Sequence, residues 1–258
     1  MISQTQMSTS PVLGDGTLLV LEEASVVFDG FKALDIQRFQ IARNELRVVI
    51  GPNGAGKTTL CDVISAKTRL SSGKVLFDGI DITHSSEYEI ARHGVGRKFQ
   101  TPMGFGSLTV YENVELALPG SNGILENIWR RPSQKAKDQI FEVLESVGLA
   151  KFSHLTAHEL SHGQKQALEF AMLLVAKPKL LLVDEPAAGL SESESISTAN
   201  LLLRLKGQHT MIIIEHDMNF VRHLDSQVTV LNEGQVLAEG PMQEVQLDPH
   251  VIEAYLGR

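Results

Sequence analysis

The sequence has a single cysteine, no long apolar run and no excess of positive charge, and each absence excludes a class of protein. One cysteine cannot form a disulfide within the chain, so we expect a reducing compartment such as the cytoplasm. The longest apolar candidate, residues 167–176, contains Glu169 and is much shorter than the ~20 residues that cross a membrane, so any membrane contact is expected to be peripheral. The formal net charge of -8 argues against sequence-independent binding of nucleic acid, which usually requires a basic surface.

The first residues, 1–17, contain Ser, Thr, Gln and Gly and lack the charged start and the apolar run of a secretion signal. We therefore expect them to form a flexible tail. The remaining residues, 18–258, are numerous and apolar enough for one large domain or two small ones, because the whole chain is 43% hydrophobic.

A glycine-rich phosphate-binding pattern is the strongest signal in the sequence. Four residues separate its first glycine from Gly-Lys-Thr, an apolar strand is predicted before it at 46–50, and a helix is predicted directly after it. The alternative is a glycine-rich turn that binds nothing. The residues predicted to bind a nucleoside triphosphate here are Gly51, Pro52, Asn53, Gly54, Ala55, Gly56, Lys57, Thr58 and Thr59.

The last three residues of this pattern have separate predicted roles. The glycines and the helix N-terminus would turn backbone N–H groups toward phosphate oxygens. Lys57 would reach the β- and γ-phosphates, the Thr58 hydroxyl would hold Mg²⁺, and Thr59 is placed near the α-phosphate.

Two carboxylates end a fully apolar run farther along the chain. Residues 180–183 predict a buried strand of a parallel sheet, and Asp184 and Glu185 follow it directly. At the carboxyl end of such a strand, Asp184 can hold Mg²⁺ through water and Glu185 can activate an attacking water molecule. Either carboxylate alone could instead cap a helix or face solvent.

Three other residues are candidates because of their position beside predicted strands. Gln100 ends the strand pattern at 94–99 and could ligate Mg²⁺ or position water, although this signal is weak by itself. His216 follows the apolar strand at 210–214 and could donate a hydrogen bond toward a γ-phosphate, and its alternative is a structural histidine. Phe28 precedes the Asp29-Gly30 turn of predicted antiparallel hairpins and could stack on an adenine ring, with core packing as the alternative.

The composition changes after residue 100, and helices at 110–118 and 133–147 predict an inserted helical subdomain over about residues 101–171. Within it, Ser161 is a good N-cap for an apolar helix and Gly163 frees the backbone, so Ser161, Gly163 and Gln164 predict a second anion site without a lysine. A phosphate loop combined with such a separate Ser-x-Gly segment suggests two chains that enclose nucleotides between them.

These motifs, in this order, resemble those of the ATP-binding cassette family from about residue 18 to residue 258. The resemblance implies an α/β fold, namely a P-loop NTPase (RecA-like) core with an antiparallel β subdomain and an inserted α-helical subdomain, and it implies ATP and Mg²⁺ as cofactors. The catalytic positions that match are Lys57, Gln100, Glu185 and His216. The metal positions that match are Thr58, Gln100 and Asp184. Phe28 matches the adenine-stacking aromatic, and residues 160–164 match the signature.

Two positions depart from the family pattern. His162 replaces the glycine that is usual in the signature, while Ser161 and Gly163 remain. Ser191 replaces the aspartate that is usual after the carboxylate pair, which leaves open how that loop couples the two chains.

Within the family, four segments at 96–100, 160–166, 215–222 and 251–258 resemble bacterial urea importers. The related branched-chain amino-acid importers share residues 187–190 and a similar tail. We therefore expect the ATP-hydrolysing subunit of an importer, for urea or alternatively for branched-chain amino acids or another small amide.

The resemblance also implies partners and a location. It implies a second, different cassette subunit, two transmembrane permease subunits and an extracytoplasmic solute-binding protein, with no nucleic acid. The chain would lie peripherally on the cytoplasmic face of the bacterial inner membrane. A soluble cassette ATPase acting on DNA or ribosomes is the rival class, but such proteins generally carry a long coiled-coil insertion or two cassettes, and this chain has neither.

Overall fold

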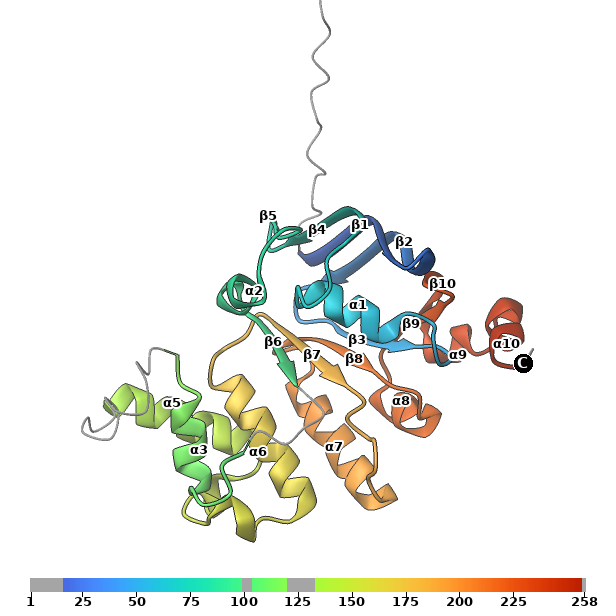
Figure 1. The fold of residues 1–258 in the computed structure, drawn as a ribbon. Helices are drawn as coiled ribbons and strands as arrows, with labels where there is room; N and C mark the ends of the chain where they lie inside the picture. Colours follow the sequence, from blue (N-terminus) through green and yellow to red (C-terminus); the bar gives the residue numbers. More distant parts are fainter. Residues whose placement is uncertain (1–15, 99–103, 120–132, 257–258) are drawn as a thin grey trace, which may run out of the picture.

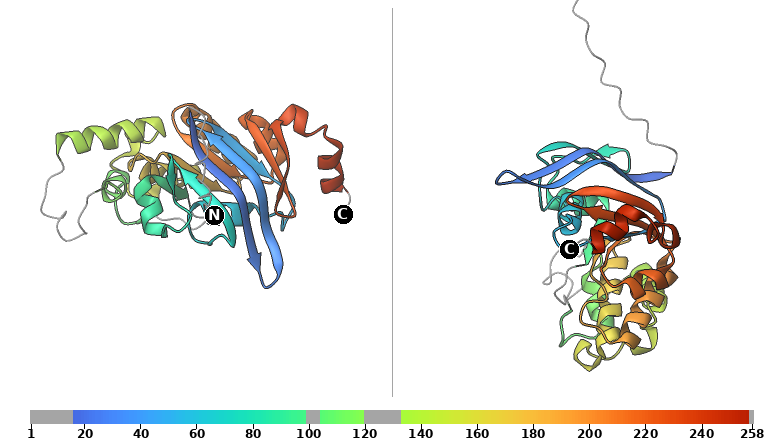
Figure 2. Two further views of the ribbon diagram at one scale, coloured as in Figure 1. Left: turned by 90° about the horizontal axis from the view of Figure 1, so that it is seen from above. Right: turned by 90° about the vertical axis from the view of Figure 1, so that its right-hand side faces the viewer.

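The computed structural model describes residues 16–98, 104–119 and 133–256 of the chain. Figure 1 shows two β-sheets with a helix between them and more helices on the far side of the larger sheet. The right-hand view of Figure 2 shows the same layers from the side, with the small sheet above and the helices below.

Among the residues that the structure describes, the smaller sheet has four strands in the order β2-β1-β4-β5, and each pairing is antiparallel. It begins with the long hairpin of β1 (Thr17–Phe28) and β2 (Phe31–Ala42), and it is completed by β4 (Ser72–Phe77) and β5 (Ile80–Asp81). The hairpin turns at Asp29 and Gly30, which both have positive φ, as two-residue hairpin loops require. The predicted antiparallel β subdomain is confirmed. Of the predicted tail, only Gly16 and Thr17 are described, and Thr17 already starts β1.

In the described part of the chain, the larger sheet has six strands in the order β10-β9-β3-β8-β7-β6. All its pairings are parallel except that of β9 with β10, which form a hairpin. The strands are β3 (Leu46–Ile50), β6 (Val95–Lys98), β7 (Leu180–Asp184), β8 (Thr210–Ile214), β9 (Gln227–Asn232) and β10 (Gln235–Pro241). The apolar runs predicted a buried parallel sheet, and β7 and β8 are indeed buried along nearly their whole length.

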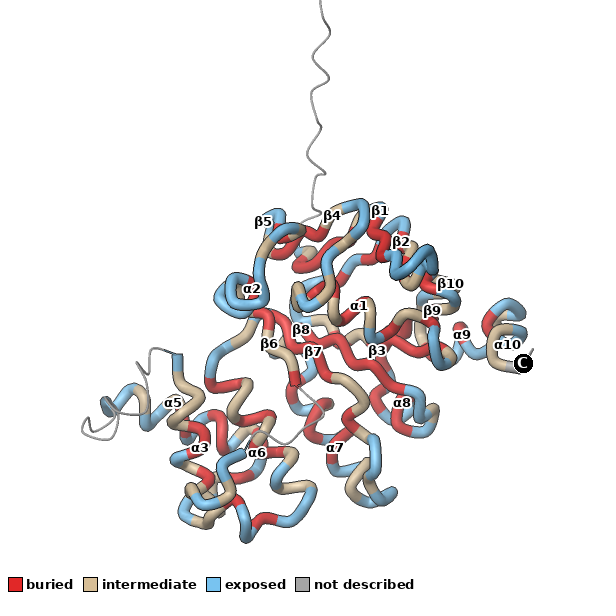
Figure 3. Tube along the Cα trace, in the orientation of Figure 1, coloured by how far each residue is buried: buried red, intermediate tan, exposed pale blue. Residues whose placement is uncertain are grey.

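Helix α1 (Lys57–Ile64) lies between the two sheets. Its buried residues, including Leu60 and Cys61, share one core with the small sheet and with one face of β7 and β8. Cys61 is fully buried, and burial raises the pKa of its thiol, so it packs as a small apolar residue. Figure 3 shows this buried layer continuing across the strands of the large sheet.

The other helices cover the opposite face of the large sheet or its edges, and a second core joins α3, α5, α6, α7 and α8 to that face. They are α2 (Glu87–His93), α3 (Val110–Leu116), α5 (Gln134–Ser146), α6 (His162–Leu174), α7 (Glu192–Leu205), α8 (Met218–Leu224), α9 (Met242–Val245) and α10 (Pro249–Leu256), with short 3₁₀ helices at Ala150–Phe152 and Ala157–Glu159. Within the described ranges, none of the helices combines the length and the apolar character needed to cross a membrane.

The parallel pairing of β3, β7 and β8 decides where the site lies. Parallel strands place their carboxyl ends at one edge of the sheet, so the segments that follow these three strands meet there. These segments begin with Gly51, Glu185 and Glu215, which brings the glycine-rich loop, the carboxylate pair and His216 together.

Candidate functional site

The glycine-rich loop connects β3 to α1 and depends on two close backbone contacts. Gly51 has φ +154°, and a Cβ placed there would lie 2.2 Å from the carbonyl oxygen of Leu231. Gly56, just before the helix, has φ +97°, and its Cβ would lie 2.7 Å from the carbonyl oxygen of Ala33. Only glycine fits both positions without a shift of the backbone, so the loop packs directly against the ends of neighbouring strands.

The side chain of Lys57 folds back into this loop. Its Nζ atom donates hydrogen bonds to the carbonyl oxygens of Gly51 at 2.7 Å and Pro52 at 3.0 Å. Burial lowers the pKa of Lys57, while the nearby carboxylates of Glu185 and Asp184 act in the opposite direction. A buried ammonium group inside a glycine loop is well placed to receive an anion.

A cavity of about 320 Å³ opens over this loop. Its lining brings the phosphate loop together with aromatic side chains of the β1–β2 hairpin and with the carboxylate of Glu185. The lining residues are Phe28, Phe31, Ala33, Asn53, Gly54, Ala55, Gly56, Lys57, Thr58, Thr59 and Glu185. Phe28 is 51% exposed and Phe31 is 65% exposed, so neither ring is packed in the core. The open rings favour the stacking interpretation of Phe28 over the core-packing alternative.

Asp184 ends β7 in a largely buried position beside an arginine. Burial raises the pKa of the Asp184 carboxyl, and the Arg97 guanidinium, whose Nη2 lies 3.5 Å from Oδ2, acts against that rise. Arg97 also contacts Asp62 of α1, with 2.5 Å between Nη1 and Oδ1. The ion pairs therefore link β6, β7 and the helix that follows the glycine loop.

Glu185 and His216 lie side by side at the ends of β7 and β8. His216 Nδ1 is 3.5 Å from Glu185 Oε1, and the histidine side chain is 60% exposed. Glu185 has φ +46°, which is unusual for a side-chain-bearing residue, and its N–H donates to the carbonyl oxygen of Ile214 at 2.9 Å. The backbone thus turns Glu185 out of the sheet and into the cavity over the glycine loop.

The remaining predicted residues either are outside the described part of the chain or do not line this cavity. Gln100 lies outside the described residues. Ser161 is the N-cap of α6, where its side chain accepts a hydrogen bond from the Gln164 N–H, and Gln164 Oε1 accepts one from the Ser161 N–H. Ser161, Gly163 and Gln164 are not among the residues that line the cavity over the glycine loop. The described chain therefore does not bring its two predicted phosphate-binding segments together.

The two residues that depart from the family pattern have different surroundings. His162 is exposed at the start of α6. Ser191 precedes α7, where its N–H and hydroxyl both donate to Glu194 Oε2, at 3.0 and 2.7 Å.

Three residues near the site were not found by sequence reasoning. Phe31 follows the same turn that Phe28 precedes, and the symmetry of a two-residue hairpin loop could have indicated it. Arg97 stands three residues before Gln100, and Glu215 stands directly before His216, but nothing in a single sequence shows what either side chain contacts.

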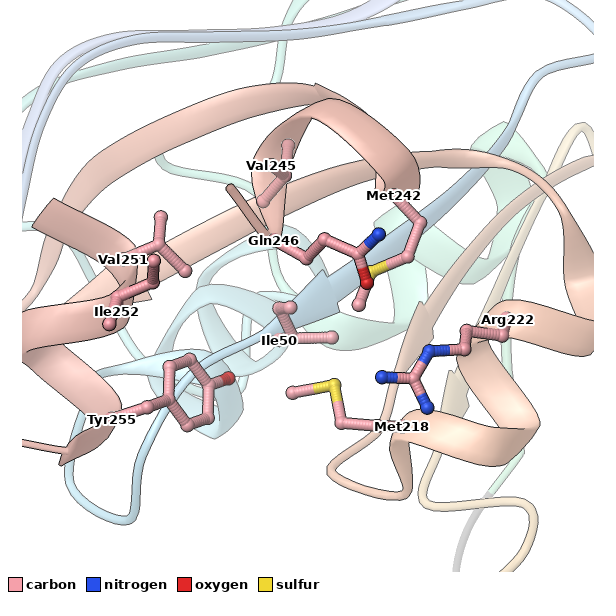
Figure 4. Close-up of a pocket in the computed structure, with 9 residues that line it drawn as sticks. All are labelled: Ile50, Met218, Arg222, Met242, Val245, Gln246, Val251, Ile252 and Tyr255. Carbon is pink, nitrogen blue, oxygen red and sulfur yellow. The ribbon is translucent and has the colours of Figure 1, made fainter. Parts of the chain in front are cut away.

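A second cavity, of about 240 Å³, lies beneath the C-terminal helix α10 and is shown in Figure 4. Its lining is mostly apolar and includes two methionines. The lining residues are Ile50, Met218, Arg222, Met242, Val245, Gln246, Val251, Ile252 and Tyr255. Burial raises the pKa of Tyr255 to about 12. This cavity offers packing surface but no pair of catalytic groups, so the candidate chemistry belongs to the cavity over the glycine loop.

Comparison with protein families gives two matches. A model described as ABC transporter matches residues 34–188. A model described as branched-chain amino acid ATP-binding cassette transporter matches residues 235–258.

Several named proteins are similar over nearly their whole length. A probable branched-chain amino acid transport ATP-binding protein, LivG of Archaeoglobus fulgidus, is 34% identical over 245 residues, covering 93% of this chain and 95% of that protein. BraF of Pseudomonas aeruginosa, a high-affinity branched-chain amino acid transport ATP-binding protein, is 32% identical, covering 93% and 98%. LivG of Escherichia coli, with the same description as BraF, is 33% identical with the same coverage.

Solved structures agree with this result. The crystal structure of an ATP-binding cassette of an ABC transporter in its ADP conformation has a TM-score of 0.80 at 32% identity, covering 94% of this chain and 99% of that one. A nucleotide-free ATP-binding cassette from an ABC transporter has a TM-score of 0.78 at 31% identity, covering 94% and 100%.

Proposed function

The chain belongs to the ATP-binding cassette family of ABC transporters, and from that premise we propose that it is the ATP-hydrolysing subunit of an importer for branched-chain amino acids. The observation that carries the proposal is the shared cavity of Lys57, the glycine loop and Glu185. A cation and backbone N–H groups for phosphate, and a carboxylate for water, are the parts that phosphoryl transfer to water requires.

Each side chain at this edge of the sheet has a role in the proposed reaction. Lys57 would exchange its two carbonyl partners for β- and γ-phosphate oxygens. Glu185 would accept a proton from the attacking water, and His216, 3.5 Å away, would hold that water and the γ-phosphate in place. Phe28 and Phe31 would stack on the adenine ring.

Mg²⁺ would be held by Thr58, by Asp184 and, by family resemblance, by Gln100. The donor set suits this ion, because Mg²⁺ favours oxygen ligands and usually binds through one or two carboxylates together with substrate phosphates. The described residues contain no cluster of three or more His, Cys, Asp or Glu that could hold a metal ion by itself. The ion would neutralise charge on the phosphates.

A complete site would need a second cassette. Ser161, Gly163 and Gln164 belong to α6 and do not line the cavity over the glycine loop of their own chain. In the proposed assembly they would contact the nucleotide held by the glycine loop of a partner cassette. This contact can be tested by mixing two variant chains, each of which lacks a different half of the site. Two transmembrane permease subunits and an extracytoplasmic solute-binding protein would complete the importer, and the cassette would lie on the cytoplasmic face of the inner membrane.

Branched-chain amino acids replace urea as the proposed solute. The urea expectation came from four short segments, whereas the family match at residues 235–258 and the similar proteins named above concern branched-chain amino acids. None of these comparisons supports urea as the solute, so urea uptake serves only as the second measurement in the test below.

The test is uptake of labelled leucine and labelled urea by source cells that carry Lys57→Ala, compared with unmodified cells at low external solute. We expect loss of leucine uptake and unchanged urea uptake. Loss of urea uptake alone would overturn the proposed solute while leaving the ATPase assignment intact. Recovery of the chain only with ribosomes or nucleic acid, and never with membranes, would overturn its role in transport.

A further inference from the structure

Glu215 is a charged residue buried inside the large sheet, at the point where β8 ends. Only 1% of its surface is exposed. Its carboxylate accepts three backbone hydrogen bonds: Oε1 accepts from the N–H of Ala187 at 2.8 Å, and Oε2 accepts from the N–H groups of His216 at 3.0 Å and Asp217 at 3.3 Å. A buried carboxylate is costly unless it is well hydrogen-bonded, so these contacts explain how it is tolerated.

The two oxygens of this carboxylate serve two different loops. Ala187 lies two residues after Glu185 in the loop that leaves β7, whereas His216 and Asp217 belong to the loop between β8 and α8. Ala187 and Glu215 are 28 residues apart along the chain. One side chain therefore joins the loop of the proposed base to the loop of the proposed switch histidine.

The backbone of Glu215 also contacts β3, the strand that precedes the glycine-rich loop. The N–H of Glu215 donates to the carbonyl oxygen of Val49 in β3 at 3.2 Å, and β3 leads directly into the glycine-rich loop. Glu215 thus contacts the loops that follow β7 and β8, and the strand that precedes the glycine-rich loop.

Only a carboxylate can accept hydrogen bonds from both loops at once. It offers two acceptor oxygens and no donor, whereas a glutamine side chain of the same shape offers one oxygen and turns an NH₂ group toward the other loop. Because a donor would then face the N–H of Ala187 or those of His216 and Asp217, one loop must move away. Burial raises the pKa of the Glu215 carboxyl, but the three N–H groups oppose that rise and favour the charged form that can accept from both loops.

We propose that Glu215 is a positioning residue for ATP hydrolysis. It fixes the loops of Glu185 and His216 to each other and so holds these two side chains in their relative position. This inference rests on the proposed function. Glu215 does not line the cavity over the glycine loop, so it acts through the groups it holds and not on the nucleotide.

The test compares ATP turnover by the full-length chain, purified with the proteins that accompany it in source cells, before and after Glu215→Gln. We expect kcat to fall about 10- to 100-fold, because a displacement of about 1 Å in a catalytic group costs up to that factor. The KM for ATP should change less than about threefold, because the glycine loop and Lys57 are untouched. Normal kcat in a folded Glu215→Gln variant would overturn the proposal.

A matched control separates positioning from a general effect of the substitution. Glu89→Gln makes the same chemical change in a carboxylate that also accepts a backbone N–H, from Ser86 at 2.8 Å, but at the start of α2. It should leave kcat unchanged. If Glu215→Gln melts below the assay temperature, Glu215→Asp keeps the charge but is one methylene too short to reach both loops, and it should show the same fall in kcat.

A double-mutant cycle gives a readout that a purely structural role would not move. In a His216→Ala background, Glu215→Gln should lower kcat by a clearly smaller factor than it does in the unmodified chain, because one of the groups that Glu215 positions is already absent. Full additivity would contradict the proposal. Glu185→Gln serves as the check on the function itself: if the unmodified complex hydrolyses ATP and Glu185→Gln does not, a normal Glu215→Gln variant refutes this inference alone. Absence of hydrolysis by the unmodified complex would refute both.

Discussion

Two glycines of the phosphate loop allow a test of how closely the loop must approach β2. Gly54 and Gly56 both have positive φ, +81° and +97°, so alanine is strained to a similar degree at either position. They differ in their surroundings. A Cβ on Gly54 would meet nothing within 4 Å, whereas a Cβ on Gly56 would lie 2.7 Å from the carbonyl oxygen of Ala33 and 3.2 Å from Cα of Gly234.

The expected cost follows from these contacts. Left-handed backbone costs a residue with a side chain about 1–2 kcal/mol, and both variants share this term. Gly56→Ala adds an overpacking term of about 1–3 kcal/mol, because both neighbouring atoms belong to the backbone and cannot rotate away. At roughly 2–4 °C per kcal/mol, Gly56→Ala should melt about 2–12 °C below Gly54→Ala.

ATP turnover should differ more between Gly54→Ala and Gly56→Ala than their melting temperatures do. Lys57 follows Gly56 directly, so a shift of the loop displaces the ammonium that meets the phosphates, and a shift of about 1 Å can cost on the order of 100-fold in turnover. Thermal melting and steady-state ATP turnover on both variants provide the measurement. Equal melting temperatures and equal turnover for Gly54→Ala and Gly56→Ala would refute the close approach to Ala33 as the reason for glycine at this position.

Three further predictions concern the proposed base, the two exposed phenylalanines and a histidine outside the site. Glu185→Gln should retain ATP binding in a nucleotide-binding assay and lose about 10²- to 10⁴-fold in turnover, and near-normal hydrolysis would remove Glu185 from the role of base. Phe28→Ala and Phe31→Ala should each weaken ATP binding about 5- to 150-fold if the rings stack on adenine, while Tyr88→Ala, another exposed aromatic, should not change it. Burial lowers the pKa of His209, so the folded chain favours the neutral ring. The stabilisation of the folded chain by the neutral ring is fully present above the ordinary histidine pKa. It is lost as the pH falls from that value to the lowered pKa. His209→Gln should therefore lose less melting temperature than the unmodified chain between pH 7.5 and 5.5, and equal losses would contradict this assignment.

Much of the candidate site could be predicted because its residues occur in short contiguous motifs, each of which directly follows an apolar strand. The glycine loop, the carboxylates after β7 and the histidine after β8 each follow an apolar strand, and parallel strands bring their carboxyl ends together. The second cavity, under α10, was not predicted. Its walls come from β3, α8 and the C-terminal helices, which no local pattern relates to one another.

The interactions between the motifs depend on residues far apart in sequence. Arg97 meets Asp62 at a separation of 35 residues and Asp184 at a separation of 87, and the buried carboxylate of Glu215 meets Ala187 at a separation of 28. A single sequence shows that these residues are charged. It does not show which partners neutralise them, because distances across the fold are set by the packing of strands and helices.

The sequence by itself determined the α/β class, the antiparallel hairpin at the start, the position of the phosphate loop and the order of the motifs. These features follow from local rules: glycine tolerates positive φ, apolar runs form buried strands, and polar residues gather where such strands end. Only the tertiary structure decided that Phe31 shares the cavity with Phe28 and that Lys57 folds back onto Gly51. Those arrangements depend on how two sheets and their helices pack around α1, and packing is a property of the whole chain.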